Sequence, residues 1–282
     1  MKTLLSIGHG YSARALGRLL LAQGWRVIAT TRSVEKAELL RSEGLEAMVW
    51  TGGPLPLEEA THLLTSVAPD RMGDPVLAAQ KEAIAAAQHL AWAGYLSTVG
   101  VYGDHGGGWV DEETPLTPTT ERGRARVAAE ADWQRLGLPL HIFRLAGIYG
   151  PGRGPFAKVR AGAARLIVKP GQVFSRIHVD DIAQVLAASI AHPSPGRIYN
   201  VCDDAPSPPE DVLAYAAELL GLPRPPEERF DPAQMTPMAA SFYAENKRVR
   251  NDRIKAELGV TLLYPDYRAG LEAILNAETQ AG

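Results

Sequence analysis

The amino-terminal segment carries the pattern that most constrains the fold. A short apolar run of strand length, Leu4 to Ile7, leads into a turn at residues 8–13 that reads Gly-His-Gly-Tyr-Ser-Ala. Leu16, Leu19 and Leu20 then recur at helical spacing along one face. A G-x-G-x-x-A turn between a strand and an amphipathic helix is typical of the first βαβ unit of a dinucleotide-binding fold.

Each small residue of this turn has a physical role. Gly8 allows the tight turn, Gly10 lets the backbone approach a pyrophosphate, and Ala13 lets the helix pack closely on the strand. The unpaired N–H groups at the helix N-terminus then face the phosphate charge. We therefore expect Gly8, Gly10, Tyr11, Ser12 and Ala13 to contact the cofactor.

The second predicted strand, Trp25 to Thr30, ends without an acidic residue. A protein that selects NAD normally places Asp or Glu on the ribose hydroxyls about 20 residues after the glycines, whereas residues 30–33 here read Thr-Thr-Arg-Ser. The planar guanidinium of Arg32 suits the 2′-phosphate of NADP. The alternative is an ordinary surface residue at a strand end. We expect NADP in preference to NAD, held at this end by Thr31, Arg32 and Ser33.

The composition narrows the class of protein. The chain has 282 residues, 46% of them apolar and 22% charged, with a formal net charge of −3. This near-neutral balance argues against a broad nucleic-acid surface, and no segment is long and apolar enough to cross a bilayer. Cys202 is the only cysteine, which excludes a disulfide framework and a cysteine-rich metal site. We expect a cytoplasmic monomer or homodimer with a small-molecule substrate and with no metal, nucleic-acid or membrane partner.

Strand and helix patterns alternate through the first half, which predicts an α/β fold: a Rossmann-type, doubly wound parallel sheet with helices on both faces. Further strands are expected at 45–50, 62–67, 94–99, 140–145 and 197–201, and further helices at 34–43, 75–91, 123–136, 180–191, 208–220 and 267–277. Residues 103–118 and 222–237 are predicted as loops. The rhythm breaks after Gly150. We therefore expect a dinucleotide-binding domain of residues 1–153 plus about 176–203, and a smaller C-terminal substrate domain of about 154–175 and 204–282.

Motifs along nearly the whole chain resemble those of the extended and atypical short-chain dehydrogenase/reductases, the NAD-dependent epimerase/dehydratase superfamily. Besides the turn at residues 8–13, they lie at 96–103 (LSTVGVYG), 111–116 (DEETPL), 144–152 (RLAGIYGPG), 176–181 (RIHVDD) and 198–201 (IYNV). The resemblance implies a sheet of about seven strands, with the nicotinamide at their carboxyl ends and a small domain closing over it. Ser66, Ala68, Ser97, Ala146 and Gly147 complete the predicted set of cofactor contacts.

The resemblance also implies a catalytic Ser or Thr after the fifth strand and a Tyr-x-x-x-Lys pair on the next helix. Thr98 falls at the first position, where a hydroxyl can donate to a substrate carbonyl or alkoxide; alternatively, it bonds only its own turn. The pair is absent, because Arg122 stands where the Tyr belongs and Arg126 where the Lys belongs. A guanidinium keeps its proton and cannot replace the phenol, although Arg126 can hold the cofactor ribose. The alternative for both arginines is a solvated helix face.

Two further residues are candidates for proton transfer. Asp74 lies where the family usually has an active-site Asn, just before the alanine-rich helix. It can relay a proton through water or cap the helix, and capping is the preferred interpretation. Tyr102 is the phenol nearest to Thr98 in the sequence. We expect Tyr102 to form a wall of the substrate pocket, with proton donation as the alternative.

Arg176 is expected to point into the pocket between the domains, where it would attract an anionic group such as a carboxylate or phosphate. The alternative is an ion pair with Asp180 or Asp181. His178 is interpreted as a satisfied core histidine. The predicted substrate contacts are Tyr149, Arg176 and Tyr243, with Asn246 and Lys247 as further candidates.

Two functions are compatible with these residues. The first is an NADP(H)-dependent oxidoreductase or epimerase that acts on a small polar substrate with a modified proton relay, since hydride chemistry belongs to the nicotinamide. The second is a catalytically inactive NADP-binding protein that senses redox state or regulates a partner. The two arginines favour the second function, whereas Thr98 and a complete small domain favour the first.

Overall fold

The computed structural model describes residues 1–281, and the side chains of all of them except residues 237, 238 and 281. Its centre is a seven-stranded sheet in which every neighbouring pair is parallel. In sheet order, the strands are β11 (Ile198–Val201), β7 (Leu140–Leu145), β5 (Trp92–Thr98), β4 (His62–Thr65), β1 (Thr3–Ile7), β2 (Arg26–Thr31) and β3 (Glu46–Val49). From β1 the chain adds β2 and β3 on one side and then crosses to β4 on the other side. This is the strand order of a doubly wound Rossmann sheet.

Helices cover both faces of the sheet, because its strands carry apolar side chains on both sides. One face packs on α1 (Tyr11–Ala22), α2 (Val34–Ser42), α6 (Val179–Ala191) and α9 (Asp252–Leu258). The other packs on α3 (Pro75–Ala86) and α4 (Glu121–Gln134). Adjacent residues of β1 show the alternation, since Leu4 lies in the first apolar core and Leu5 in the second. The predicted fold class is thereby confirmed.

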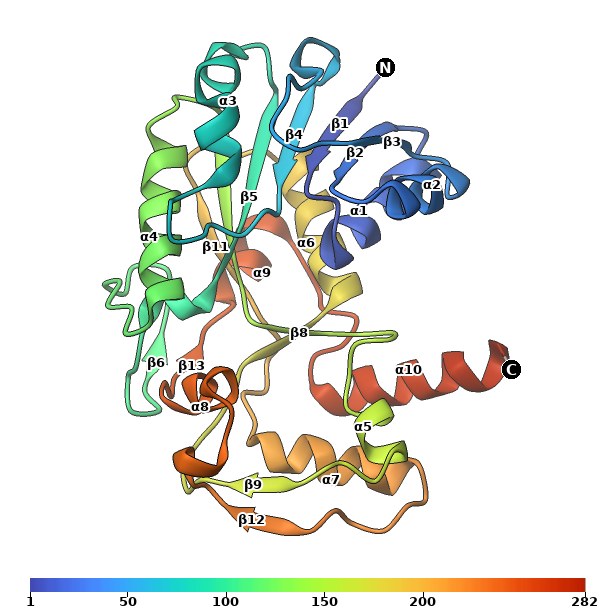
Figure 1. Ribbon diagram of the computed structural model, residues 1–282, viewed down its shortest axis with the longest axis vertical. Helices are drawn as coiled ribbons and strands as arrows, with labels where there is room; N and C mark the ends of the chain where they lie inside the picture. Colours follow the sequence, from blue (N-terminus) through green and yellow to red (C-terminus); the bar gives the residue numbers. More distant parts are fainter. Residues whose placement is uncertain (282) are drawn as a thin grey trace.

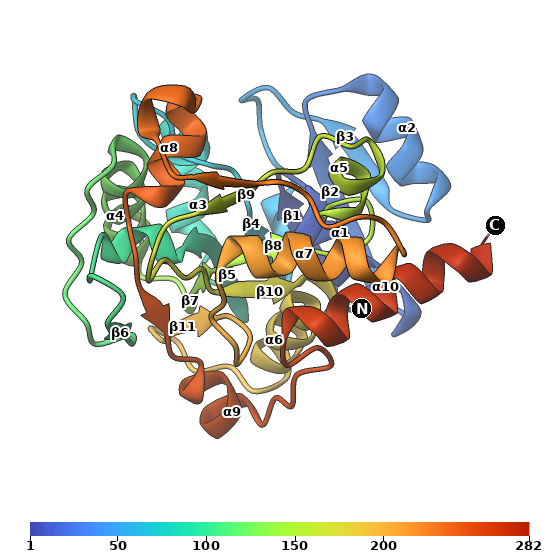
Figure 2. The same cartoon turned by 90° about the horizontal axis from the view of Figure 1, so that it is seen from below.

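A third apolar cluster lies beyond the carboxyl ends of the strands. It is formed by α5 (Phe156–Arg160), α7 (Pro209–Leu219) and α10 (Tyr267–Ala281), which we call the C-terminal layer. Figure 1 shows this layer below the sheet, with the parallel pair β9 (Leu166–Val168) and β12 (Glu227–Arg229) along its outer side. A second parallel pair, β8 (Gly147–Tyr149) and β10 (Arg176–His178), runs between the sheet and this layer. Seen from below, α7 and α10 cross the end of the molecule (Figure 2).

The remaining elements are short. Three 3-10 turns occur at Leu57–Glu59, Val99–Tyr102 and Pro232–Gln234, and the helix α8 spans Pro237–Tyr243. The strand β6 (Trp109–Val110) pairs with β13 (Arg248–Val249) in parallel. None of the helices in the described part of the chain is long and apolar enough to span a membrane. The proposed domain boundaries stay a prediction, although the third cluster has its own apolar core.

Several predicted boundaries are corrected by the structure. The helix expected at 75–91 ends at Ala86, and Gln80 inside it has non-helical torsion angles. The loop expected at 222–237 contains β12, and the loop expected at 103–118 contains β6. Both strands were missed because neither has an alternating apolar pattern: β12 reads Glu-Glu-Arg and is exposed throughout. Their pairing depends on partners far away in the sequence, β9 and β13.

A buried ion pair links α4 to the sheet. Arg144 Nη2 of β7 lies 2.8 Å from Glu130 Oε2 of α4, and both side chains are less than 5% exposed. Ser97 Oγ donates a hydrogen bond to Glu130, and Arg144 Nη1 donates to the hydroxyl of Tyr102 at 3.0 Å. That hydroxyl in turn donates to Asn200 Oδ1 at 2.7 Å. One network therefore connects three strands, α4 and the turn that follows β5.

Replacing Glu130 with alanine is expected to lower the free energy of unfolding by about 3–5 kcal/mol, because Arg144 would stay buried without a counter-charge. Equilibrium unfolding in urea measures the loss. Asp132→Ala is the matched control: Asp132 lies on the same helix in an exposed pair with Arg135, and such pairs contribute less than about 1 kcal/mol. Equal losses in the two variants would contradict the structural importance of the buried pair.

Candidate active site

A cleft of about 850 Å³ lies between the carboxyl ends of the strands and the C-terminal layer. Its walls come from the turn after β1, the ends of β4, β5 and β7, the start of α4 and segments of the C-terminal half. The predicted site residues that line it are Gly8, Gly10, Tyr11, Ser12, Ser66, Ala68, Ser97, Thr98, Arg122, Arg126, Ala146, Gly147, Tyr149 and Arg176. Those outside its lining are Ala13, Thr31, Arg32, Ser33, Asp74, Tyr102 and Tyr243.

The turn after β1 has the geometry that a dinucleotide phosphate needs. Gly8 has φ +73°, and a Cβ there would lie 2.6 Å from Val67 Cγ2, so only glycine fits. Gly10 is the N-cap of α1 and provides no side-chain cap, and the first turn of α1 has no acidic residue. The N–H groups at this helix end are therefore free to bind an anion from the cleft. Ala13, in the first turn of α1, is fully buried, as its predicted role in packing the helix on the strand requires.

Thr30 supports this turn and was not recognised from the sequence. Its Oγ1 accepts a hydrogen bond from Gly8 N at 2.9 Å, and its carbonyl accepts one from His9 N at 2.9 Å. The glycine turn is thus fixed by the end of the neighbouring strand β2. A threonine near a strand end carries no local signal for such a role, because the contact arises only from the pairing of β1 with β2.

The end of β2 lies at the surface beside α2. Arg32 is exposed, and Ser33 caps α2 by accepting from Lys36 N at 3.1 Å while its hydroxyl donates to Glu35. Thr31 is largely buried. Arg32 has no ion pair with any described residue, so its guanidinium is available to a ligand. None of these three residues lines the cleft, and the preceding residue, Thr30, connects them to it by its hydrogen bond with the glycine turn.

Thr98 ends β5 and lines the cleft. Its Oγ1 accepts a hydrogen bond from Gly100 N at 3.1 Å, which caps the following turn. The residue therefore bonds its own turn and faces the cleft at the same time, so both interpretations of the sequence apply. A Cβ on Gly123 would lie 2.9 Å from the carbonyl oxygen of Gly100. The first turn of α4, which carries Arg122, thus packs directly against the turn after Thr98.

The two arginines of α4 differ in their surroundings. Arg126 Nη1 donates to the carbonyl oxygen of Leu96 at 2.8 Å and to the hydroxyl of Tyr95 at 3.0 Å. Its guanidinium is thereby held against β5 at the cleft wall. Arg122 is exposed, lines the cleft and has no hydrogen bond or ion pair with a described residue. Both side chains reach the cleft, and neither lies on a purely solvated helix face.

Asp74 is a helix cap and not a cleft residue. Its Oδ1 accepts hydrogen bonds from Val76 N at 2.8 Å and Leu77 N at 3.2 Å, and its Oδ2 accepts one from Trp133 Nε1 at 2.8 Å. The side chain is 5% exposed. Because both oxygens are occupied within the core, the geometry favours capping and gives Asp74 no path for a proton to the cleft.

The expectation that Tyr102 forms a wall of the substrate pocket is wrong. Its side chain is fully buried and belongs to the core on one face of the sheet. The hydroxyl is held between Arg144 and Asn200, and burial raises the pKa of the phenol to about 12. Tyr102 points inward because the 3-10 turn after Thr98 directs its side chain toward Arg144 of β7. The sequence pattern alone did not predict this direction.

At the far end of the cleft, Arg176 and Tyr149 line the wall beside the C-terminal layer. Tyr149 donates its hydroxyl hydrogen to the carbonyl oxygen of Asp266 at 3.2 Å. Tyr243 lies behind this wall, stacked on Phe230 with a ring separation of 5.1 Å. The ion pair considered for Arg176 with Asp180 or Asp181 is not formed. His178 Nδ1 accepts from Asp180 N at 3.2 Å at the start of α6, and burial lowers the pKa of its imidazole.

The cleft lining is strongly cationic. Among the described residues, the lining holds one carboxylate, that of Glu245, and five basic side chains: Arg122, Arg126, Arg153, Arg176 and Lys247. Lys247 Nζ lies 2.7 Å from Glu245 Oε2 and donates to the carbonyl oxygen of Gly103 at 2.6 Å. Glu245 also accepts from Thr119 Oγ1 at 2.7 Å. This pair joins the segment before β13 to the segment before α4, whereas the other cations stay open to a ligand.

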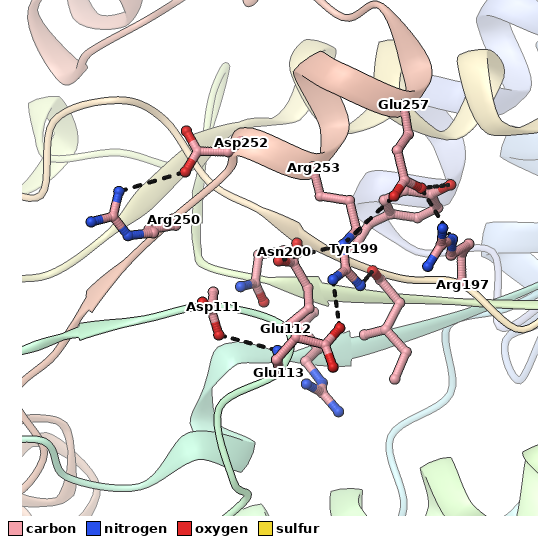
Figure 3. Close-up of polar contacts among 12 residues, drawn as sticks. Asp111, Glu112, Glu113, Arg197, Tyr199, Asn200, Arg250, Asp252, Arg253 and Glu257 are labelled. Carbon is pink, nitrogen blue, oxygen red and sulfur yellow. Dashed lines mark hydrogen bonds and ion pairs between the residues drawn. The ribbon is translucent and has the colours of Figure 1, made fainter.

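The DEETP motif at residues 111–115 has a structural role away from the cleft (Figure 3). Glu112 Oε1 accepts a hydrogen bond from Asn200 N of the edge strand β11 at 2.8 Å. On α9, Arg253 Nε lies 3.8 Å from Glu112 Oε2, and Arg253 Nη2 lies 2.6 Å from Glu113 Oε1. Because an edge strand leaves backbone groups unpaired, Glu112 satisfies one that the sheet cannot. The motif therefore bonds one backbone N–H of the edge strand β11 and links this strand to α9.

Comparison with known proteins agrees with this architecture. Residues 7–202 match the model of the family described as "NAD dependent epimerase/dehydratase family". The chain belongs to this family. Protein YeeZ of Escherichia coli is 30% identical over 284 aligned positions, which cover 94% of this chain and 97% of YeeZ.

Two solved structures illustrate the range of the likeness. A functionally unknown conserved protein from Silicibacter pomeroyi is 64% identical, with a TM-score of 0.96 over 98% of this chain and 99% of that one. The human epimerase family protein SDR39U1, solved with NADPH, is 18% identical, with a TM-score of 0.73 over 97% of this chain and 99% of the human chain. The second likeness is one of fold. Members of the family bind a nicotinamide dinucleotide.

Replacing Asp74 with alanine is expected to destabilise the protein by about 1–3 kcal/mol, because the cap of α3 is lost and the indole N–H of Trp133 is left unpaired. Affinity for the cofactor is expected to stay unchanged. Thermal unfolding and a cofactor titration on the same sample test both parts. A clear loss of affinity in a folded Asp74→Ala variant would return this residue to the site.

Proposed function

We propose that this protein is an NADP(H)-dependent oxidoreductase or epimerase that acts on a small polar substrate. The observation that carries the proposal is one cleft that contains both the uncapped N-terminus of α1 and the Thr98 side chain. The first is suited to the phosphates of a dinucleotide. The second is suited to the oxygen of a reacting carbonyl.

The preference for NADP is supported by charge. The chain has a net charge of −3, yet its cleft is lined by five basic residues and one acid. At the end of β2, Arg32 is exposed and unpaired among the described residues. A guanidinium at this position suits a 2′-phosphate, whereas the ribose hydroxyls of NAD call for a carboxylate.

The chain's own residues fit the chemistry of a modified site. A bound nicotinamide supplies hydride transfer, so the protein must orient the substrate and stabilise charge on its oxygen. Thr98 would donate a hydrogen bond to that oxygen, while Arg122 and Arg126 would provide fixed positive charge beside it. Neither guanidinium can give up its proton at neutral pH. The proton is therefore expected to come from solvent at the open side of the cleft, where Arg122 is exposed.

A second function is favoured by the same two arginines. With Arg122 and Arg126 in place of a phenol and an ammonium, the protein can bind NADP without turning it over and report the cofactor state to a partner. The two functions differ in one measurable property, because only the enzyme consumes NADPH when a carbonyl substrate is supplied.

Replacing Arg32 with glutamate is expected to weaken NADPH binding by about 10- to 100-fold and to shift the preference toward NADH, because a charge-assisted contact to the 2′-phosphate becomes a repulsion. Isothermal titration with both cofactors measures the change. Arg135→Glu, at the exposed C-cap of α4, is the control and should bind as wild type does. Unchanged NADPH affinity in Arg32→Glu would exclude the predicted contact, and wild-type protein that binds neither cofactor would exclude the whole proposal.

Replacing Thr98 with valine is expected to lower kcat for NADPH-dependent carbonyl reduction by about 100-fold, since one donor to the developing oxyanion is lost, with cofactor affinity little changed. The assay follows NADPH absorbance with a panel of small carbonyl compounds and sugar nucleotides. Thr61→Val, remote from the cleft, controls for loss of a hydroxyl. A wild-type protein that binds NADPH but turns over no member of the panel would favour the regulatory function.

A further inference from the structure

Arg176 is a partly buried cation without a counter-charge. It lies on β10 and lines the cleft beside the C-terminal layer. Its Nη1 donates to two backbone carbonyl oxygens, of Phe174 at 2.9 Å and Ser207 at 3.0 Å. Among the described residues it forms no ion pair, and burial lowers the pKa of its guanidinium. A charge removed from water without a partner is costly, so this position calls for an anionic ligand.

Two acidic side chains face Arg176 without pairing to it. Asp203 follows β11 and is 1% exposed, and its backbone N–H donates to the carbonyl oxygen of Arg176 at 2.6 Å. Glu210 lies in the first turn of α7. One carboxyl oxygen of each, Asp203 Oδ2 and Glu210 Oε2, is buried with no hydrogen-bond partner in the described chain. The structure therefore holds an unpaired guanidinium and two incompletely bonded carboxyl groups around one end of the cleft.

The protonation of these acids decides the charge that a ligand meets. Burial raises the pKa of Asp203 to about 8, with the charge of Arg176 acting in the opposite direction. Burial also raises the pKa of Glu210. The other titratable groups facing them are Asp204, Asp211 and Glu227, and the phenols of Tyr149, Tyr243 and Tyr267 face Arg176. Below pH 8, Asp203 is mostly neutral, and the guanidinium is free to pair with a ligand.

The single positive charge of Arg176 favours an anion that carries one negative charge. A single guanidinium supplies a planar fork that matches one carboxylate. A dianionic phosphate group would bring its second charge close to Asp203 and Glu210 with no further cation from β10 or α7. The walls around Arg176 include Tyr149, Val212 and Leu271, which suit the short carbon chain of an organic acid.

We propose that the substrate of the cleft carries a carboxylate that binds the guanidinium of Arg176, and that ionised Asp203 competes with this carboxylate for the same cation. The inference rests on the proposed function, because the carboxylate lies in the cleft that holds the cofactor. Arg176 is then the residue that selects for an acid over its neutral analogue. Asp203 is a positioning residue that makes this selection depend on pH.

The direction of the pH effect follows from the neutral form of Asp203. As the pH rises through about 8, the carboxyl loses its proton and neutralises Arg176, so the affinity for the substrate carboxylate falls. At pH 9, about one tenth of Asp203 retains its proton, which predicts about a tenfold weaker affinity than at pH 7. Asp203→Asn has a similar shape and no proton to lose, and should therefore bind equally at both values.

The test uses full-length protein loaded with NADP⁺ and a series of oxo-monocarboxylates of three to six carbons, each paired with its methyl ester, with binding measured by ligand-observed NMR. At pH 7, at least one acid is expected to bind about tenfold more tightly than its ester. Arg176→Gln should remove this preference, Arg176→Lys should keep part of it, and Arg135→Gln should leave it intact. Thermal unfolding confirms that each variant is folded.

Three outcomes would overturn the inference: no acid binds better than its ester, the preference survives in Arg176→Gln, or Asp203→Asn keeps the wild-type pH dependence. Each is distinct from a failure of the proposed function. Cofactor titration in the same samples reports that function separately, and NADP⁺ binding without a carboxylate preference would contradict only the role of Arg176 and Asp203.

Discussion

Parallel pairing of the central strands places the residues of the cleft next to one another. Ile7 of β1 is paired with Thr65 of β4, and Thr98 of β5 with Leu145 of β7. Because parallel strands end at the same edge, the glycine turn, Ser66, Thr98 and Ala146 meet there although they are far apart in the sequence. The same edge of the sheet faces the C-terminal layer, and the cleft lies between this edge and that layer. The positions proposed for the cofactor and for the substrate both depend on this one register.

Charge inside the cleft opposes the charge of the whole chain. A protein with net charge −3 concentrates five basic residues around one cavity and leaves one carboxylate there, itself paired with Lys247. Such a cavity attracts anions even when the rest of the surface does not. Two of these basic residues, Arg122 and Arg126, stand where the family pattern has Tyr and Lys. In the proposed function, these two residues supply permanent positive charge where the family pattern has a proton relay, and the site would therefore favour ligands that carry phosphate or carboxylate groups.

Much of this architecture could be predicted from local patterns. The turn at residues 8–13 specified its own conformation, because Gly8 needs a positive φ and a close approach to Val67 that no other residue allows. Thr98 was assigned from the family resemblance, by its position in the motif at residues 96–103. Lys247 was named as a candidate substrate contact, but its ion pair with Glu245 and the supporting role of Thr30 were not predicted, since these contacts form only in the folded chain. The strands β6 and β12 were missed for the same reason.

The sequence by itself determined the βαβ order, the parallel sheet and the nucleotide-binding turn, because strand periodicity, helix periodicity and glycine conformation are local properties. Tertiary structure decided the direction in which individual side chains point. Tyr102 is in the core and Arg176 lines the cleft, although each lies in a motif that resembles the same family. For Asp74 the sequence favoured a cap over a relay, and only the contact of its second oxygen with Trp133 shows that both oxygens are occupied in the core. Side-chain direction depends on partners distant in the sequence, and no local pattern contains them.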